Sequence, residues 1–264
     1  MESRLGQTAT LSIVIPAYNE EVRLPALLEK LSAEAADAAA DAGMRLLEVL
    51  VVDDGSTDRT RELLEAATGG NEQLRPVFPY ARNRGKGAAF AAGALEAEGD
   101  YVLLADVDLS TPLGELSKLT AAIEAGADVA IGSRAVAGAV VERGPVHRKV
   151  TGNTFNGAVR LLTGLRVRDT QNGFKLFPSE PVKRYAAQQT CPGFAFDVEL
   201  LMRADCEGLR IAEVPILYMH DLRSSVNVAS ASSRMLREVA GLAYRLRLRK
   251  GAAAADSGDI VRAA

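Results

Sequence analysis

Short apolar runs alternate with longer segments of helical periodicity along the first half of the chain. Residues 11–15 (LSIVI) and 46–52 (LLEVLVV) are apolar and rich in β-branched residues, which predicts that both are buried strands. Between them, leucines recur at helical spacing and an alanine-rich stretch runs up to Gly43, which predicts a helix. This order of strand, helix and strand is the repeating unit of a parallel sheet.

The same alternation continues through the following hundred or so positions. A helix through Leu63 and Leu64 is expected to begin at the capping side chains of Ser56 and Thr57. Further helices are expected at 87–97 and 113–125, and further strands at 77–78, 101–105 and 128–131. The pattern therefore predicts an α/β fold with a mostly parallel sheet and helices on both faces.

The periodicity weakens beyond Gly132, where basic residues, glycines and short apolar runs alternate. Near the end, residues 231–250 place Met235, Val239, Leu242 and Leu246 on one helical face with arginines around it. This pattern predicts an amphipathic C-terminal helix, which could lie on a membrane surface or pack on its own domain or on a second copy of the chain.

Composition limits the class of protein. The 264 residues are 48% hydrophobic and 25% charged, which is typical of a folded domain, and a net charge of −3 provides no chain-wide cationic field for nucleic acid. Cys191 and Cys206 are too few for a disulfide scaffold, which favours a reducing, cytoplasmic compartment. No apolar stretch approaches the roughly 18–20 residues of a membrane span, and residues 1–10 lack the features of a signal peptide.

Polar segments follow three of the predicted strands, at 16–20 (PAYNE), 53–58 (DDGSTD) and 106–108 (DVD). In an open parallel sheet, ligands bind outside the carboxyl ends of the strands, so these segments outline one candidate site. Asp106 and Asp108 could both reach a hard cation such as Mg²⁺ or Mn²⁺, which commonly bridges carboxylates to phosphates. The alternative is that both carboxylates only stabilise a turn and a helix start.

A basic loop at 82–87 (RNRGKG) places three cations and two glycines before a predicted helix. Cations and helical N–H groups both favour anions, so this loop is a candidate phosphate site, and a solvated basic loop is the alternative. The glycine spacings of ATP-binding and dinucleotide-binding loops are absent, which argues against both of those functions.

Five motifs in order resemble the GT-A nucleotide-sugar fold, a Rossmann-like α/β fold, of family-2 glycosyltransferases. They are VIPAYNEE (14–21), VVDDGSTD (51–58), RNRGKGAA (82–89), DVD (106–108) and GSR (132–134). Two later motifs, RDTQNGFKLF (168–177) and FAFDVELL (194–201), look like the subgroup that glycosylates polyprenyl or dolichyl monophosphate, most of all the dolichyl-phosphate β-glucosyltransferases. The resemblance covers about residues 11–222.

The resemblance implies roles for individual residues. Those implied to surround the nucleoside are Pro16, Tyr18, Glu20 and Asp53. Asp106 and Asp108 would hold the metal and the donor diphosphate, with Lys86 and Arg82 in the matching basic loop. Arg134 falls where related phosphomannose synthases contact the acceptor phosphate, and Arg148 is a second candidate anion contact. His220 is a candidate to close over the diphosphate, although a lone histidine is more often structural.

The chemistry of the acceptor separates two classes of transferase. A phosphate monoester is already largely ionised near neutral pH, its second pKa being about 6, so it needs no catalytic base. It needs in-line placement and cations that offset its repulsion by the donor diphosphate, which Arg134, Arg148 and a metal could supply. A hydroxyl acceptor needs a base, for which Asp197 is the candidate; Asp197 and Glu199 could instead only orient their neighbours.

The sequence therefore leads to the hypothesis of an inverting, metal-dependent hexosyltransferase that moves glucose from a UDP-sugar to an isoprenoid phosphate at the cytoplasmic face of a membrane. The alternatives are a GDP-mannose donor, a hydroxyl acceptor, and a nucleotide-sugar-binding regulator without turnover. The expected organisation is a catalytic domain at 1–222 with interface helices at about 144–165, a loop and amphipathic helix at 223–250, and a disordered tail at 251–264. Peripheral membrane contact is expected, nucleic-acid binding is not, and a homo-oligomer is left open.

Overall fold

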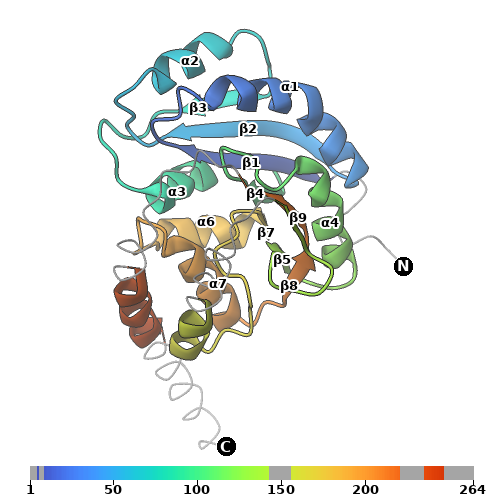
Figure 1. Ribbon diagram of the computed structural model, residues 1–264, viewed down its shortest axis with the longest axis vertical. Helices are drawn as coiled ribbons and strands as arrows, with labels where there is room; N and C mark the ends of the chain where they lie inside the picture. Colours follow the sequence, from blue (N-terminus) through green and yellow to red (C-terminus); the bar gives the residue numbers. More distant parts are fainter. Residues whose placement is uncertain (1–4, 6–8, 143–155, 221–234, 247–264) are drawn as a thin grey trace, which may run out of the picture.

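The computed structural model of the chain describes residues 5, 9–142, 156–220 and 235–246. Within these ranges, seven strands form one sheet in the order β3-β2-β1-β4-β7-β5-β8, and β6 pairs with β9 beside it (Figure 1). The strands are β1 (Thr10–Ala17), β2 (Arg45–Asp53), β3 (Leu74–Val77), β4 (Tyr101–Leu104), β5 (Val129–Ser133), β6 (Val140–Glu142), β7 (Lys175–Pro178), β8 (Ile211–Pro215) and β9 (Leu217–Met219). The helices are α1 (Leu24–Asp41), α2 (Thr60–Ala67), α3 (Lys86–Glu96), η1 (Leu113–Glu115), α4 (Leu116–Glu124), α6 (Ser179–Ala187) and α7 (Phe196–Cys206), with helical residues also at 156–163 and 235–246.

The predicted α/β fold is confirmed. Strands β1 to β4 run parallel to one another, as do β5 and β8, and each strand expected in the first half of the chain is present within a few residues of its expected bounds. Strand β7 is antiparallel to both β4 and β5, which makes the sheet mixed. Its pairing was not predicted, because a run as short as KLFP carries no periodicity that distinguishes a strand from a loop.

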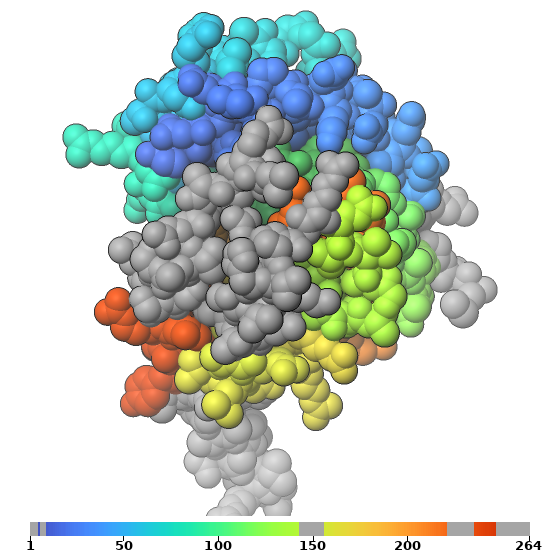
Figure 2. Space-filling view, in the orientation of Figure 1, coloured from blue at the N-terminus to red at the C-terminus, as the bar shows by residue number. Residues whose placement is uncertain are grey.

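Helices cover both faces of the sheet. Helices α1, α2 and α4 lie on one face and α3, α6 and α7 on the other, and Figure 2 shows the early part of the chain at the top of the view and the later part below. Ile13 and Ile15 of β1 belong to the first apolar core, whereas Val14 belongs to the second. Successive side chains of a strand point to opposite faces, so a strand buried on both sides is continuously apolar, as LSIVI is.

The expected start of α2 was wrong. The helix begins at Thr60, whose backbone N–H donates to Asp58 Oδ1 at 2.9 Å, rather than at a cap formed by Ser56 or Thr57. Those two residues instead bind Asn19: the Asn19 N–H donates to Ser56 Oγ at 2.9 Å and the Thr57 N–H donates to Asn19 Oδ1 at 2.8 Å. The contacts of Ser56 and Thr57 with Asn19 therefore join the segments that follow β1 and β2.

Part of the predicted C-terminal helix lies among the described residues. Residues 235–246 are helical, and Val239, Leu242 and Leu246 are buried in the same apolar core as α3, α6 and α7. This packing on the chain's own core was one of the alternatives left open by the sequence. The remainder of the expected helix, the expected tail at 251–264 and residues 144–155 of the expected interface helices lie outside the described residues. Among the helices that the structure does describe, none combines the length and apolarity needed to cross a bilayer.

Candidate active site

The three polar segments that follow the predicted strands meet at one edge of the sheet. Ala17 at the end of β1 pairs with Asp53 at the end of β2, and Val14 of β1 pairs with Leu104 at the end of β4. Because these strands are parallel, their carboxyl ends open on the same side. The sequence-based expectation that the three segments outline one site is consistent with this register.

The residues implied to surround a nucleoside differ in exposure. Pro16 and Asp53 are buried, whereas Tyr18 has 41% of its surface exposed. Asp53 Oδ1 accepts the backbone N–H of Ser56 at 3.0 Å, so this carboxylate also stabilises the turn after β2. Glu20 is buried and binds Arg23, with Oε2 at 2.6 Å from Arg23 Nε, and burial raises the pKa of Glu20 above its usual value.

Asp54 shapes the basic loop, a role that the sequence analysis did not assign to it. Its buried carboxylate accepts hydrogen bonds from Asn83 Nδ2 at 2.8 Å and from the backbone N–H groups of Arg84 at 2.9 Å and Gly85 at 2.7 Å. The signal was present as two adjacent acids, of which a turn needs only one. Arg82 has an exposed side chain, while its backbone packs on the turn after β2.

Gly55 makes that close packing possible. A Cβ atom at Gly55 would lie 2.5 Å from the Arg82 backbone, and the residue has a φ of +70°, which L side chains rarely adopt. The turn after β2 and the basic loop therefore form one unit, fixed by Asp54 on one side and by this contact on the other.

Lys86 is the first residue of α3 and turns toward the carboxylates at the end of β4. Its Nζ lies 2.5 Å from Asp106 Oδ1 and 5.8 Å from the centre of the Phe196 ring. Burial alone would lower the pKa of Lys86, but the charges of Asp106 and Asp197 raise it above its usual value, so the side chain carries a positive charge. The structure thus brings Lys86 and Asp106 together, two residues that the sequence assigned to different parts of a diphosphate site.

Asp106 and Asp108 have opposite pKa shifts. Burial opposes ionisation of Asp106, but the charge of Lys86 outweighs it and lowers the pKa of Asp106. Burial and the charge of Asp106 raise the pKa of Asp108. The backbone N–H of Leu109, the residue after Asp108, donates to the Asp106 carbonyl at 3.0 Å and closes a turn; Leu109 has a φ of +43°, a strained value for a branched side chain. The turn keeps two repelling carboxylates near one another, a pattern that a cation would relieve.

These carboxylates fit a hard divalent cation. Within the described ranges, no group of three or more His, Cys, Asp or Glu side chains is arranged to hold a metal. Two aspartates are nevertheless a suitable set for Mg²⁺ or Mn²⁺, because such ions commonly take one or two carboxylates together with phosphate oxygens of a substrate. Gly173 helps to form the site, since a Cβ there would lie 2.3 Å from both carboxylate oxygens of Asp106.

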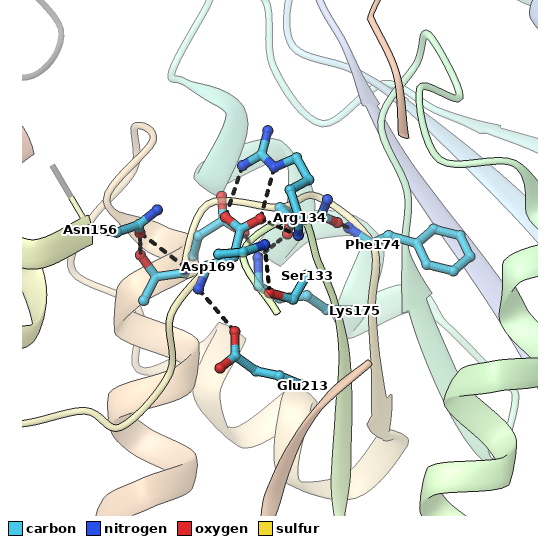
Figure 3. Close-up of polar contacts among 11 residues, drawn as sticks. Ser133, Arg134, Asn156, Asp169, Phe174, Lys175 and Glu213 are labelled. Atoms are coloured by element: carbon cyan, nitrogen blue, oxygen red, sulfur yellow. Dashed lines mark hydrogen bonds and ion pairs between the residues drawn. The ribbon is translucent and has the colours of Figure 1, made fainter. Parts of the chain in front are cut away.

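Arg134 follows β5 and forms a two-pronged ion pair with Asp169 (Figure 3). Its Nε and Nη2 each lie 2.8 Å from an Asp169 oxygen, and its backbone N–H donates to Asp169 at 2.9 Å. Asp169 is itself fixed because its N–H donates to Glu213 Oε1 at 2.9 Å. Burial would lower the pKa of Arg134, but the charge of Asp169 raises it above its usual value. The charge of Arg134 also helps to lower the pKa of Asp106. Asp169 was missed by the sequence analysis, although it lies in the quoted RDTQNGFKLF motif.

Tyr218 joins Arg134 to His220. The Arg134 guanidinium lies 4.9 Å from the centre of the Tyr218 ring, and the His220 ring meets the Tyr218 ring edge-on at 5.0 Å. His220 N–H donates to the Glu142 carbonyl at 3.3 Å. The structure therefore associates His220 with Arg134, while Arg148, the second expected anion contact, lies outside the described residues.

Asp197 lies inside the protein next to a buried lysine. Asp197 is 2% exposed and Lys175 is 0% exposed, and Lys175 Nζ donates to Asp197 Oδ1 and to the Asn172 carbonyl. Burial raises the pKa of Asp197 despite the neighbouring charge of Lys175. Lys175 was not singled out by the sequence analysis, because a lysine is rarely expected in the interior.

Glu199 is an ordering residue for the segment before α7. It is fully buried, binds Arg203 at 2.6 Å, and accepts the backbone N–H groups of Thr190 at 3.0 Å and Cys191 at 2.7 Å. The segment that it orders supports the start of α3, since Ala88 N–H donates to the Pro192 carbonyl at 3.0 Å. Burial raises the pKa of the Cys191 thiol to about 12, so this thiol is protonated near neutral pH.

A cleft of about 1070 Å³ lies beside the basic loop and the segment before α7, with Arg84 and Thr190 among its lining residues. Its walls come from β3, the outer side of α3 and the segment before α7, and include Phe78, Leu95 and Pro192. None of the site residues predicted from the sequence lines this cleft. The candidate active site is therefore the polar edge of the sheet, where the charged residues converge.

Comparisons with known proteins bear on this site. The sequence model of the family described as Glycosyl transferase family 2 matches residues 12–188. A dolichyl-phosphate beta-glucosyltransferase of Drosophila melanogaster is 36% identical over 78% of this chain and 66% of its own length. A polyprenol monophosphomannose synthase of Mycolicibacterium smegmatis is 30% identical over 86% of this chain and 82% of its own. This chain thus spans about two thirds of the glucosyltransferase relative.

A solved structure shares the fold. Glucosyl-3-phosphoglycerate synthase from Mycobacterium tuberculosis, crystallised with Mn²⁺, uridine-diphosphate and glucosyl-3-phosphoglycerate, superimposes with a TM-score of 0.61 at 21% sequence identity. The alignment covers 90% of this chain and 80% of that one. At this identity the likeness concerns the fold, which agrees with the GT-A-like architecture expected from the sequence.

Proposed function

The chain belongs to glycosyl transferase family 2, and on this basis we propose that it transfers a hexose, glucose first, from a UDP-sugar to a polyprenyl or dolichyl monophosphate. The proposal gives the strand-end carboxylates to the donor and Arg134 to the acceptor. Because the lipid acceptor lies in a bilayer, the proposal places the protein at the cytoplasmic face of a membrane as a peripheral protein.

One observation carries the proposal: cations and carboxylates from separate elements converge at the same edge of the sheet. Lys86 contacts Asp106 at 2.5 Å, and the charge of Arg134 acts on the same carboxylate. A reaction between two phosphate-bearing substrates needs this composition, since the donor diphosphate requires cations and an acceptor phosphate brings further negative charge.

The chain's own residues would bind and orient both substrates. Asp106 and Asp108 would hold a divalent ion, which when bound neutralises charge on the leaving diphosphate. Lys86 would add a second positive charge on the donor side, and Arg134 would place an acceptor phosphate oxygen in line with the anomeric carbon. The bond from that oxygen to the anomeric carbon forms as the bond to the diphosphate oxygen breaks, so the anomeric configuration inverts and UDP leaves.

The environment of Asp197 favours a phosphate acceptor over a hydroxyl. A catalytic base must come within hydrogen-bond reach of the proton that it removes. Asp197 is 2% exposed and already binds Lys175, so it is poorly placed to meet a substrate hydroxyl. A phosphate acceptor, which needs no base, is compatible with this arrangement.

The choice of donor rests on the relatives. The relative from Drosophila melanogaster is named as a beta-glucosyltransferase, and the one from Mycolicibacterium smegmatis as a monophosphomannose synthase. Both names contain an isoprenoid phosphate acceptor, and they differ in the sugar. GDP-mannose is therefore the second candidate donor, supported by the longer coverage of the phosphomannose relative.

Donor choice is tested by calorimetry of the purified chain with Mn²⁺ and either UDP or GDP. The proposal predicts binding of UDP that depends on the metal and is lost in Asp108→Asn. Tighter binding of GDP than of UDP would move the assignment to the mannose donor. Absence of binding by either nucleotide would refute the proposal.

A further inference from the structure

Four charged side chains of alternating sign form a row from the candidate diphosphate site into the core. Its members are Asp106 after β4, Lys86 at the start of α3, Asp197 in the first turn of α7 and Lys175 at the start of β7. Each residue comes from a different element, so this row of charges links four parts of the fold. The outer pair is partly exposed, whereas Lys175 is 0% exposed and Asp197 is 2% exposed.

The inner pair has no direct access to a ligand. Lys175 Nζ donates to Asp197 Oδ1 and to the Asn172 carbonyl, so its donors point into the protein. A buried ion pair is often no more stabilising than apolar residues of the same volume, because both charges must leave water. Stability alone therefore gives little reason for a lysine and an aspartate at these positions.

Asp197 follows Phe196, whose ring Lys86 contacts, and its charge acts on Lys86 together with that of Asp106. The neighbouring Phe196 lies beneath Lys86, with its ring centre 5.8 Å from Nζ, and packs against Phe90 of α3 with ring centres 5.5 Å apart. The negative charges of Asp197 and Asp106 both act on the Lys86 ammonium. The first turn of α7 thus supplies both a flat apolar support and a fixed charge for this lysine.

We propose that Lys175 and Asp197 are a positioning pair, which fixes the Lys86 ammonium against Asp106 and so sets the geometry of the donor diphosphate site. Lys175 fixes the Asp197 carboxylate, and Asp197 holds Lys86 by charge. Neither residue touches substrate. The inference deepens the proposed function, on which it rests for the identity of the ligand, and it assigns Asp197 a role other than that of a base.

The test is a double-mutant cycle. Lys175→Met and Asp197→Leu each leave one buried charge without its partner, so both single variants are expected to unfold at lower temperature. The double variant Lys175→Met/Asp197→Leu removes both charges and is expected to regain a wild-type unfolding temperature. Its affinity for UDP with Mn²⁺ is nevertheless expected to fall about tenfold or more, and kcat/KM about 10²-fold, because Lys86 is no longer fixed. Wild-type affinity and kinetics in a stable double variant would overturn the proposal.

Asp197→Asn separates positioning from base catalysis. The amide keeps the shape and an acceptor oxygen for Lys175, so a positioning role predicts a raised KM for the nucleotide sugar and an unchanged pH profile of kcat. A base role predicts instead that kcat falls while UDP affinity stays at the wild-type value, and that result would overturn the proposal. Arg75→Met is the control, since it removes ion pairs with Glu48 (2.9 Å), Glu96 (2.6 Å) and Glu98 (3.5 Å), none of which belongs to the candidate site, and should leave the KM for the nucleotide sugar unchanged.

A crystal structure of the double variant tests this inference independently of the proposed function. If wild-type protein binds neither UDP nor GDP, the proposed function fails by itself, and the position of Lys86 still decides the role of the pair. The proposal predicts that Lys86 Nζ moves beyond about 4 Å, the limit of an ion pair, from Asp106. Retention of the 2.5 Å contact in that variant would overturn it.

Discussion

Arg134 and Asp169 are joined by two side-chain hydrogen bonds of 2.8 Å and a third of 2.9 Å from the Arg134 backbone. The guanidinium also lies over the Tyr218 ring, 4.9 Å from its centre, and 28% of the Arg134 side chain is exposed. Planar, two-pronged pairing gives geometric specificity that a lysine could not provide. Asp169 and Tyr218 therefore fix the orientation of Arg134, the proposed contact of the acceptor phosphate.

Replacing Asp169 with asparagine tests this arrangement. The change removes the charge that holds Arg134 while keeping a side chain of the same size. We expect the KM for the lipid phosphate to rise about tenfold and the KM for the nucleotide sugar to change little, because the loss is confined to the acceptor side. Steady-state kinetics with each substrate varied in turn provide the measurement. Equal effects on both KM values would contradict the assignment of Arg134 to the acceptor.

The same variant has a predictable pH dependence of stability. Burial would raise the pKa of Asp169, but the charge of Arg134 lowers it below the ordinary value of 3.8. The folded state therefore binds a proton at Asp169 less readily than the unfolded state does. The stabilisation is therefore fully present above pH 3.8 and is lost as the pH falls through the folded-state pKa. Wild type should exceed Asp169→Asn by about 3 kcal/mol in unfolding free energy at pH 7, and the gap should shrink as the pH falls from 3.8 through the folded-state pKa of Asp169. Urea unfolding at several pH values measures it; a gap that widens toward low pH would contradict the sign.

Gly173→Ala should impair the metal site with little effect on the fold. The new Cβ would lie 2.3 Å from the Asp106 carboxylate, which sits at the end of a side chain that can rotate away. We expect kcat/KM to fall about 10²-fold through displacement of that carboxylate, with an unfolding temperature near that of wild type. Gly114→Ala is the control, because an added Cβ there meets no atom within 4 Å. If Gly173→Ala binds Mn²⁺ and UDP as wild type does, Asp106 is not a ligand of the donor complex.

Asp54→Asn tests whether the basic loop is organised from β2. The carboxylate accepts three hydrogen bonds from residues 83–85, and an asparagine amide can accept them on one oxygen only. We expect UDP affinity to fall about tenfold and the unfolding free energy to fall by about 2 kcal/mol. Asp41→Asn, at the exposed end of α1, serves as the control for loss of an acidic residue. Unchanged nucleotide affinity in Asp54→Asn would show that the loop does not depend on this contact.

Strands β1, β2, β4 and β5 were predictable because they are buried on both faces and therefore read as nearly continuous apolar runs, whereas the mostly half-buried β8 was not predicted. The strand ends were equally legible, since PAYNE, DDGSTD and DVD interrupt those runs with polar residues. The antiparallel strand β7 was not, because its four residues between a glycine-containing loop and a helix have no distinguishing period. Its position between β4 and β5 is set by tertiary pairing, which a single sequence does not display.

Roles that depend on partners distant in sequence were likewise beyond sequence reasoning. Asp106 was identified by its type and its position after a strand, and Arg134 by the resemblance of the GSR motif to that of related transferases. Their partners Lys86 and Asp169 lie 20 and 35 residues away, and only the fold shows which carboxylate meets which cation. The pairing of Lys175 with Asp197 was also visible only in the fold, since Asp197 was considered as a candidate base and Lys175 was not singled out.

The proposed function is tested most directly by the chemical nature of the acceptor. Purified chain, Mn²⁺ and radiolabelled UDP-glucose are incubated in detergent with either a polyprenyl monophosphate or the matching polyprenol, which differs only in lacking the phosphate. The account predicts that lipid-linked glucose forms with polyprenyl monophosphate and not with polyprenol. It also predicts no such product with Arg134→Met at the same protein concentration. Transfer of glucose to polyprenol, or no lipid-linked sugar from either UDP-glucose or GDP-mannose, would contradict it.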